Sequence, residues 1–317
     1  MARYLVTGGC GFIGSHLAEA LLANGDEVRI LDNLSIGCRD NAPGDADLIV
    51  GDVADPVAVQ QAIAGTDGVF HLAAIAAIER SIDDWVGTHA SNLTGCITVF
   101  DAARRACGGP VPVIYASSAA VYERTEAVPL TETTAVKPLT PYGADKCGCE
   151  QHGYVATILH GVPTTGLRLF NVYGSGQNPD SPYSGVISVF CNRLVAGKPV
   201  TIDGDGHQVR DFIHVGDVVR FMTQAMATPS EGGVFNVCTG TGTTVLDLAE
   251  TIARLCGATL NVISRAARPG DVRFSVGDPA RAEKRFGIRA ETRLKDGLML
   301  TLASERARPA AWLRSVA

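Results

Sequence analysis

The first 32 residues restrict the fold more than any other part of the sequence. An apolar run at residues 4–7 is followed by the turn Gly8-Gly9-Cys10-Gly11-Phe12-Ile13-Gly14. Apolar residues then recur at helical spacing until Asn24-Gly25, and a second apolar run at residues 28–31 stops at Asp32. Strand, glycine-rich turn, helix and strand predict a βαβ unit of about thirty residues.

The glycines of this unit fall at the turn from strand to helix. There the backbone can approach a pyrophosphate closely, and the helix N-terminus favours negative charge. Asp32 ends the second strand, where a carboxylate accepts hydrogen bonds from both ribose hydroxyls of adenosine. Because a 2′-phosphate would meet that carboxylate, the pattern predicts NAD as the cofactor.

The alternation of strands and helices continues through the first half of the chain. Strands are predicted at residues 48–50, 69–72, 111–115 and 165–170, with helices at 57–64, 92–106 and 144–160. This order is typical of a parallel, doubly wound α/β sheet, which binds ligands beyond the carboxyl ends of its strands. Asp52, Ala73, Ser118 and Asn171 all follow such ends, so we expect them to share one site.

The character of the sequence changes after Asn171. Residues 174–185 are rich in Gly, Pro, Ser and Asn, which predicts a long loop. Shorter helical and strand patterns follow, at residues 186–194, 200–202, 235–237, 246–255, 260–263 and from 294 onward. We therefore expect a Rossmann domain at residues 1–172 and a smaller α/β substrate-binding domain at 173–317. Some segments after residue 210 are expected to pack back on the first domain.

Ser118, Tyr142 and Lys146 form the candidate reaction centre. A phenol is a weak base, but a Lys one helical turn away favours its phenolate form. The Ser118 hydroxyl can share the proton that the phenolate takes from a substrate alcohol. Beside a predicted NAD site, this combination indicates hydride transfer.

The charge and the cysteine content argue against several classes of partner and site. The 317 residues carry a net charge of −6, and no basic run suited to a phosphate backbone is present, so nucleic acid is not expected. Nine scattered cysteines without a CxxC pair argue against a disulfide framework and a zinc site. We expect reduced thiols, a cytoplasmic location, no signal segment, no membrane span and no metal.

The ordered motifs TGGCGFIG, LDNLS, GDVAD, HLAA, SSAAVY, PYGADK, LRLFNVYG, GDGHQVRDFIHVGD and RPGDVRFSVGD extend nearly from end to end. With them the chain resembles the extended short-chain dehydrogenase/reductases, in particular the NAD-dependent nucleotide-sugar epimerase/dehydratase family. The resemblance implies an NAD-dependent isomerase or lyase of nucleotide sugars, and the homodimer usual in the family.

The resemblance also assigns roles to individual residues. Ser118, Tyr142 and Lys146 match the catalytic positions, and Ser91 matches an NAD contact that is usually Asn. The complete set implied for NAD is Gly8, Gly11, Phe12, Ile13, Gly14, Asp32, Asn33, Asp52, Val53, Leu72, Ala73, Ala74, Ser91, Tyr142 and Lys146. The set implied for a UDP-sugar is Ser118, Asn171, Val186, Thr201, Ile202, Arg210, Arg268, Asp271 and Ser275.

The surroundings of the Tyr-Lys pair bear on the reaction. Dehydratases of this kind place an acid pair where this chain has Ala119-Ala120, so the resemblance favours 4-epimerisation through a 4-keto sugar. Ser275 matches the position beside the sugar 2-substituent, where a small residue admits N-acetyl sugars. The short loop at residues 179–184 also resembles the branch with N-acetyl activity. UDP-GlcNAc/UDP-GalNAc, with UDP-Glc/UDP-Gal, are the predicted substrates. A UDP-glucuronic acid 4-epimerase, a dehydratase or oxidoreductase, and a non-catalytic regulator remain alternatives.

Overall fold

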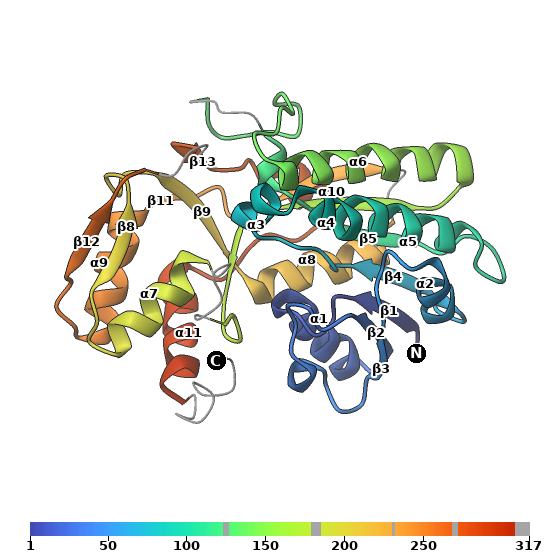
Figure 1. Cartoon of the computed structure of the whole chain (residues 1–317), viewed down its shortest axis with the longest axis horizontal. Helices are drawn as coiled ribbons and strands as arrows, with labels where there is room; N and C mark the ends of the chain where they lie inside the picture. The colour runs from blue at the N-terminus through green and yellow to red at the C-terminus, as the bar shows by residue number, and fades with distance from the viewer. Residues whose placement is uncertain (123–126, 179–184, 230–231, 268–271, 308–317) are drawn as a thin grey trace.

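A seven-stranded parallel sheet forms the middle layer of the larger part of the molecule, on the right in Figure 1. The computed structural model describes residues 1–122, 127–178, 185–229, 232–267 and 272–307. The strand order is β10-β6-β5-β4-β1-β2-β3, and every neighbouring pair is parallel. The strands are β1 (Arg3–Thr7), β2 (Glu27–Asp32), β3 (Asp47–Val50), β4 (Gly68–His71), β5 (Val113–Ser118), β6 (Thr164–Leu169) and β10 (Gly233–Val237).

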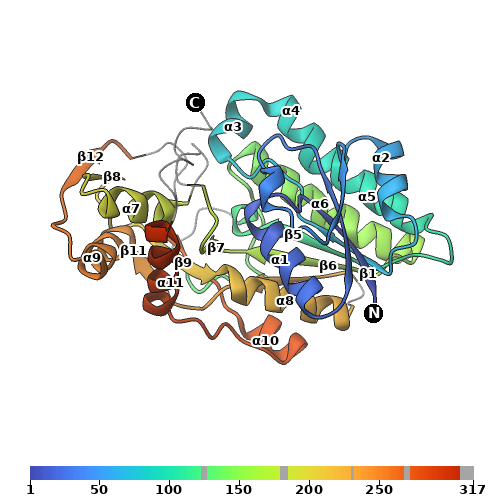
Figure 2. The same ribbon diagram turned by 90° about the horizontal axis from the view of Figure 1, so that it is seen from below.

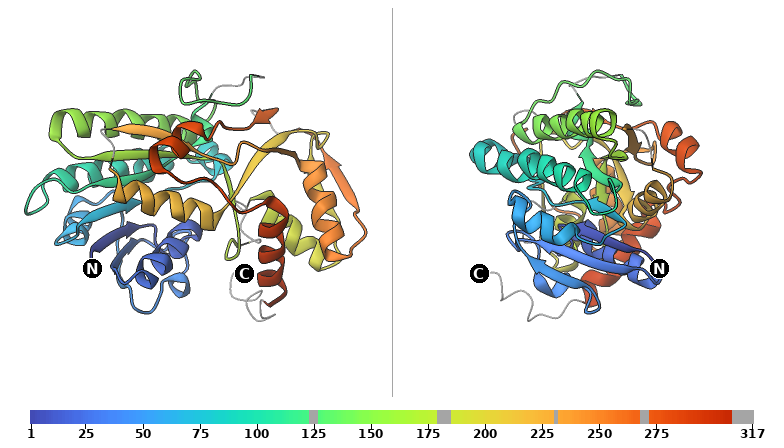
Figure 3. Two further views of the ribbon diagram at one scale, coloured as in Figure 1. Left: turned by 180° about the vertical axis from the view of Figure 1, so that it is seen from behind. Right: turned by 90° about the vertical axis from the view of Figure 1, so that its right-hand side faces the viewer.

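Helices cover both faces of this sheet (Figure 3). The first face packs on α1 (Phe12–Ala23) and α8 (Val215–Ala227), and the second on α2 (Pro56–Ile63), α5 (Gly95–Arg104) and α6 (Pro141–His160). Successive residues of β1 enter opposite cores, because side chains alternate along a strand: Val6 faces the first layer and Leu5 the second. The predicted doubly wound α/β fold is therefore confirmed.

The second half of the chain forms a smaller group of elements (Figure 2). β7 (Asn171–Tyr173) and β13 (Phe274–Ser275) pair with β9 (Val209–His214) in parallel, and β11 (Gly242–Thr244) pairs with it antiparallel. β8 (Val200–Asp203) pairs with β12 (Val262–Arg265). A separate apolar core joins α7 (Val186–Val195), α9 (Val245–Cys256) and α11 (Leu294–Ala307) to these strands.

Short helical segments complete the described part of the chain. They are η1 (Arg39–Asn41), α3 (Ile78–Asp83), α4 (Trp85–His89), the π-helical turn η2 (Ala90–Thr94), η3 (Ala119–Val121) and α10 (Ala280–Phe286). No helix in the described ranges has the length and apolar character that crossing a membrane requires.

Two parts of the second half return to the large sheet. β10 lies beside β6 at the sheet edge, and α8 packs in the same core as α1. The strand at residues 235–237 was predicted, but α8 was not. Its sequence begins Val-Gly-Asp-Val-Val, and glycine and β-branched residues are poor helix formers, so tertiary packing decides its structure. The division at residue 172 stays a prediction.

The predicted helix at residues 144–160 begins three residues earlier than expected. Pro141 occupies its first turn, and the Thr140 hydroxyl accepts a hydrogen bond from Gly143 N at 3.1 Å. Pro at this position and a Thr cap are strong start signals. As a result, Tyr142 and Lys146 both lie on α6, one turn apart.

A buried pair of side chains joins two strands of the sheet beside Leu72–Ala74, which are among the residues implied for NAD. Thr7 Oγ1 lies 2.8 Å from His71 Nδ1 and accepts from Ala73 N at 3.3 Å. Burial, with the positive charge of Lys146, lowers the pKa of His71 to about 3. His71 is therefore neutral in the folded protein, so its bond with the Thr7 hydroxyl joins two uncharged groups.

This burial predicts acid destabilisation with a defined sign. Between pH 6.5 and pH 3 the unfolded chain binds a proton at His71 that the folded protein does not, so the stability is present above pH 6.5 and falls toward pH 3. About 2 kcal/mol should be lost from this residue between pH 7 and pH 5. Urea unfolding of His71→Asn at both pH values should show a drop smaller by that amount. His152→Asn, on an exposed site of α6, should keep the wild-type pH dependence. Equal drops in wild type and His71→Asn would contradict this account.

Candidate functional site

The glycine-rich turn makes a close-packed cradle at the start of α1. Gly8 has φ +72°, and a Cβ there would lie 2.7 Å from Ala73 N. A Cβ on Gly14 would lie 2.2 Å from the Gly8 carbonyl oxygen. Gly11 caps α1 without a side-chain hydrogen bond, so no side chain competes for the amides of the first turn. The turn thus has the bare backbone that a pyrophosphate needs.

The acidic and amide side chains expected at adenosine lie together at the ends of β2 and β3. Asp32 accepts from Cys10 N at 2.9 Å and from Leu34 N at 2.8 Å, one bond on each carboxylate oxygen. Asn33 Nδ2 donates to Asp52 Oδ2 at 3.0 Å. Each oxygen of Asp32 keeps a second lone pair, so ribose hydroxyls can be added to these bonds. The residues present therefore fit the adenosine half of NAD.

The chain after β4 is held by a residue that the sequence patterns did not reveal. Asn92 is fully buried; its Oδ1 accepts from Ile75 N at 2.7 Å, and its Nδ2 donates to Ile75 O at 3.1 Å. This clamp fixes the segment just beyond Leu72–Ala74, and the predicted contact Ser91 lies next to Asn92 on the same π-helical turn. A π-helical turn inside a helix often marks a functional site. In the sequence, the available signal was an Asn at the start of a predicted helix.

The reaction-centre residues come from β5 and α6, which meet at a glycine. A Cβ on Gly143 would lie 2.3 Å from the Ala120 carbonyl oxygen, so the first turn of α6 packs directly on η3. Ser118 caps η3, and its Oγ accepts from Ala120 N at 3.2 Å. The structure thereby brings Ser118 and Tyr142 to one corner.

Lys146 is 3% exposed and is anchored on the same strand as Ser118. Its Nζ donates to the Ala116 carbonyl at 2.8 Å and lies 5.8 Å from the centroid of the Tyr142 ring. The bond to Ala116 therefore fixes the ammonium beside the Tyr142 ring. Lys146 can also donate its remaining protons to a nearby hydroxyl. The arrangement can therefore hold and move a proton.

Three of the predicted sugar-nucleotide residues lie on β9 and its neighbours β7 and β13. Ser275 is opposite Arg210 in the β13–β9 register and is 8% exposed. Arg210 donates to the Val209 carbonyl at 2.9 Å, and Asn171 Nδ2 donates to the Asp211 carbonyl at 3.1 Å. The side-chain amide nitrogen of Asn171 is thus already bonded to the backbone. Arg268, Asp271 and the loop at residues 179–184 lie outside the described residues.

Asp211 ties these strands together. Its carboxylate is completely buried and accepts from Thr239 N, Thr239 Oγ1 and Gly240 N at 2.7–2.9 Å, and from Gly277 N at 3.4 Å. Burial raises its pKa, and these hydrogen bonds work against that rise. The bonds fix the loops beside Arg210 and Ser275.

Three further residues implied for the UDP-sugar occupy two elements of the smaller core. Val186 begins α7, while Thr201 and Ile202 lie on β8. Ile202 is 3% exposed and belongs to the apolar core, so only its backbone is available to a ligand.

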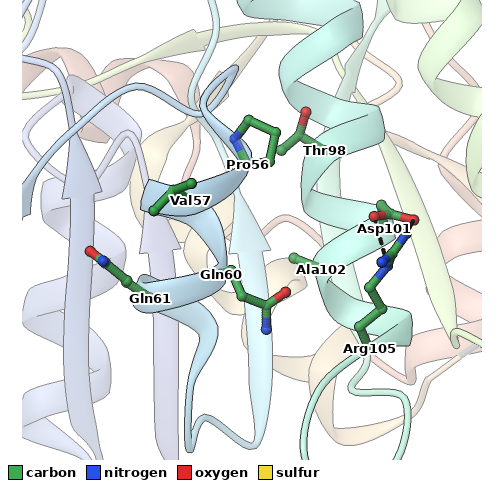
Figure 4. A pocket seen from close by; sticks show the side chains of 8 residues that line it. All are labelled: Pro56, Val57, Gln60, Gln61, Thr98, Asp101, Ala102 and Arg105. Carbon is green, nitrogen blue, oxygen red and sulfur yellow. Dashed lines mark hydrogen bonds and ion pairs between the residues drawn. The ribbon is translucent and has the colours of Figure 1, made fainter.

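A surface groove of about 460 Å³ lies elsewhere, between α2 and α5 (Figure 4). Gln60, Gln61, Thr98 and Arg105 are among its lining residues, and Asp101 there is paired with Arg105. None of the predicted site residues lines this groove, so it is separate from the site built above. Within the described ranges no cluster of His, Cys, Asp or Glu suits a metal ion.

Known proteins resemble this chain over nearly its whole length. The UDP-glucose 4-epimerase of Thermus thermophilus, solved with NAD, is 34% identical with a TM-score of 0.90, covering 97% of this chain and 100% of that one. The UDP-N-acetylglucosamine 4-epimerase of Methanobrevibacter ruminantium, solved with UDP-N-acetylmuramic acid, is 30% identical with a TM-score of 0.91, covering 96% and 98%. A dTDP-glucose 4,6-dehydratase of an Actinoplanes species is 32% identical over 98% of this chain and 99% of its own.

The family comparison covers most of the chain. Residues 4–238, from β1 to just beyond β10, match the family described as NAD dependent epimerase/dehydratase. The glycine cradle, Asp32 and the Ser118–Tyr142–Lys146 corner all lie within this range. The protein is therefore a member of the NAD-dependent epimerase/dehydratase family, with NAD as its cofactor.

Proposed function

We propose that this protein is a UDP-hexose 4-epimerase that inverts C4 through a transient 4-keto sugar. The observation that carries the proposal is the corner between η3 and α6. There, the first turn of α6 packs on η3, next to Tyr142 and Ser118, and the residues after Ser118 are Ala119 and Ala120. A corner with one phenol, one hydroxyl and one ammonium suits reversible proton transfer at a single alcohol.

In the proposed mechanism Tyr142, as phenolate, takes the proton of the sugar 4-hydroxyl, and the Ser118 hydroxyl shares it. When bound, NAD supplies reversible hydride acceptance at C4. The sugar turns about its diphosphate link while Arg210 keeps hold of the nucleotide end. Tyr142 then returns the proton to the 4-oxygen, so no net proton or hydride leaves the enzyme. Lys146 stabilises the phenolate throughout from its anchor on Ala116.

A nucleotide-sugar dehydratase is the second candidate, because one relative with nearly complete coverage bears that name. Elimination of water across C5 and C6 needs an additional acid and base. The alanines after Ser118 offer neither, which favours epimerisation. A dehydratase would release a 4-keto product, an oxidoreductase would leave reduced NAD, and a regulator would do neither.

Replacement of the phenol tests the mechanism. Tyr142→Phe removes the proton acceptor and should lower the epimerisation rate by about 10²-fold or more, with NAD still bound. The assay incubates the protein with UDP-GlcNAc, UDP-Glc and UDP-GlcA and resolves C4 epimers by NMR. Released NAD is measured by absorbance after denaturation. Unchanged epimerisation by Tyr142→Phe would remove the phenol from the mechanism.

We also propose that the enzyme accepts UDP-GlcNAc and UDP-GalNAc, together with UDP-Glc and UDP-Gal, because Ser275 leaves room beside the sugar 2-position. The structural support is its placement on β13 opposite Arg210. The Methanobrevibacter relative is named for the N-acetyl sugar. UDP-glucuronic acid is the competing substrate, since hydroxyl side chains can hold a carboxylate.

Enlarging Ser275 separates these substrates. Ser275→Tyr should lower kcat/KM for UDP-GlcNAc by at least about tenfold, equivalent to ~1.4 kcal/mol, because the ring fills the space of the N-acetyl group. Turnover of UDP-Glc by the same variant is the internal control and should persist. Equal losses on both sugars would place Ser275 away from the 2-substituent.

We further propose a homodimer through the outer face of α6. Tyr154, Val155, Ile158 and Leu159 are 45–70% exposed and lie on one side of this helix, an arrangement expected of an interface.

Ile158→Glu with Leu159→Glu should shift the protein from dimer to monomer in sedimentation equilibrium. A wild-type monomer at micromolar concentration would contradict this proposal.

A further inference from the structure

A buried ion pair lies one helical turn beyond the reaction-centre lysine. Tyr142, Lys146 and Glu150 recur every four residues along α6, so they share one helix face. Glu150 receives two hydrogen bonds from Arg168 of β6, at 2.8 and 2.7 Å, and both side chains are 5% exposed. Ser117, which precedes Ser118, donates to Glu150 at 2.5 Å. The pair thus joins α6, β5 and β6.

Arg168 also contacts the segment that follows Ser118. Its Nη1 donates to the Tyr122 hydroxyl at 2.9 Å, and its Cζ lies 4.8 Å from the centroid of the Tyr122 ring. Although burial opposes its charge, the hydrogen bonds and charge of Glu150 raise the pKa of Arg168, so it stays a cation. Tyr122 lies just after η3, four residues beyond Ser118.

The Tyr122 hydroxyl both donates and accepts a hydrogen bond. Burial raises its pKa, so the phenol stays protonated and donates to Asn236 Oδ1 at 2.6 Å while it accepts from Arg168. Asn236 Nδ2 donates to the Leu130 carbonyl at 2.9 Å. Leu130 in turn is hydrogen-bonded to Val276 and Asp278, immediately after Ser275.

Side chains from β5, the end of η3, α6, β6 and β10 therefore meet in one buried chain of hydrogen bonds, which we name the Tyr122 network: Ser117, Tyr122, Glu150, Arg168 and Asn236. The network joins the face of α6 to the segment that carries Ser118, and the Leu130 backbone extends it to Val276, next to Ser275. Shifts of about 1 Å at a reacting group can cost 10²-fold in rate. A rigid connection between these segments is thus of direct consequence for the chemistry.

We propose that Tyr122 and Arg168 are positioning residues for the reaction, and that the Tyr122 network sets the register between the Tyr142–Lys146 face, Ser118 and the sugar-facing strand. The inference rests on the proposed epimerase function. Neither residue touches the reacting atoms in this scheme. Tyr122 supplies the junction through one hydroxyl, so a single oxygen atom can be removed to test it.

Tyr122→Phe keeps the ring over Arg168 and deletes that oxygen. We expect kcat to fall by about tenfold to 10²-fold, with KM and bound NAD near wild type. The isotope effect from deuterium at C4 should rise, because misplacement slows the hydride and proton step itself. Tyr173→Phe is the matched control: Tyr173 is 2% exposed, its hydroxyl bonds the Leu294 carbonyl at 3.4 Å, and activity should be unchanged.

Several outcomes would overturn the proposal. An unaltered kcat would do so, as would a fall in kcat explained by a smaller folded fraction with an unchanged isotope effect. If Tyr122→Phe does not fold, the charge-balanced double variant Glu150→Met with Arg168→Met decides, because a buried ion pair can be exchanged for apolar residues of similar volume. The folded double variant should show the same loss of kcat, and full activity would overturn the proposal. A wild-type protein inactive on all three UDP-sugars would refute the proposed function, and this inference would fall with it.

Discussion

The parallel sheet is the constraint on which the rest of the structure depends. Parallel strands end at a common edge, so Thr7, Asp32, His71, Ser118 and Leu169 close the same side of the molecule despite their separation in sequence. β6 leads through Phe170 into β7, which joins the second sheet at β9. The smaller group of elements therefore begins at the edge where the predicted NAD contacts lie. In the proposed function, this edge is where the nucleotide sugar would meet NAD.

Several ionisable groups near this edge are buried and hydrogen-bonded. His71 is kept neutral by burial and is hydrogen-bonded to Thr7, whereas Arg168 and Glu150 form a bidentate pair. Asp211 is completed by backbone amides. Separating such partners would leave a buried polar group unpaired, which costs free energy. These residues therefore keep neighbouring segments in fixed positions. Precision at the reaction corner comes from these buried bonds.

Much of the fold was predictable, because its signals are local. Strand-glycine-helix order, a cap at Thr140 with Pro141, and alternating apolar runs specify most elements of the large sheet. The missing helix α8 shows the limit of this reasoning. Its valines and glycine disfavour a helix, and packing against α1 and the sheet outweighs that preference. Asn92 escaped notice for a related reason, since its partner Ile75 is distant in sequence.

The class of fold, the cofactor and the residue types at the reaction corner could all be inferred from the amino-acid sequence. Those features rest on short-range spacing: glycines at one turn, an acid at the next strand end, and Tyr and Lys four apart. How the corner is held became visible only in the folded molecule. Gly143 packs on the Ala120 carbonyl, and Arg168 joins Glu150 to Tyr122 across three elements. Contacts of this kind depend on which side chains the sheet and its helices bring into reach, and no spacing along the chain encodes them.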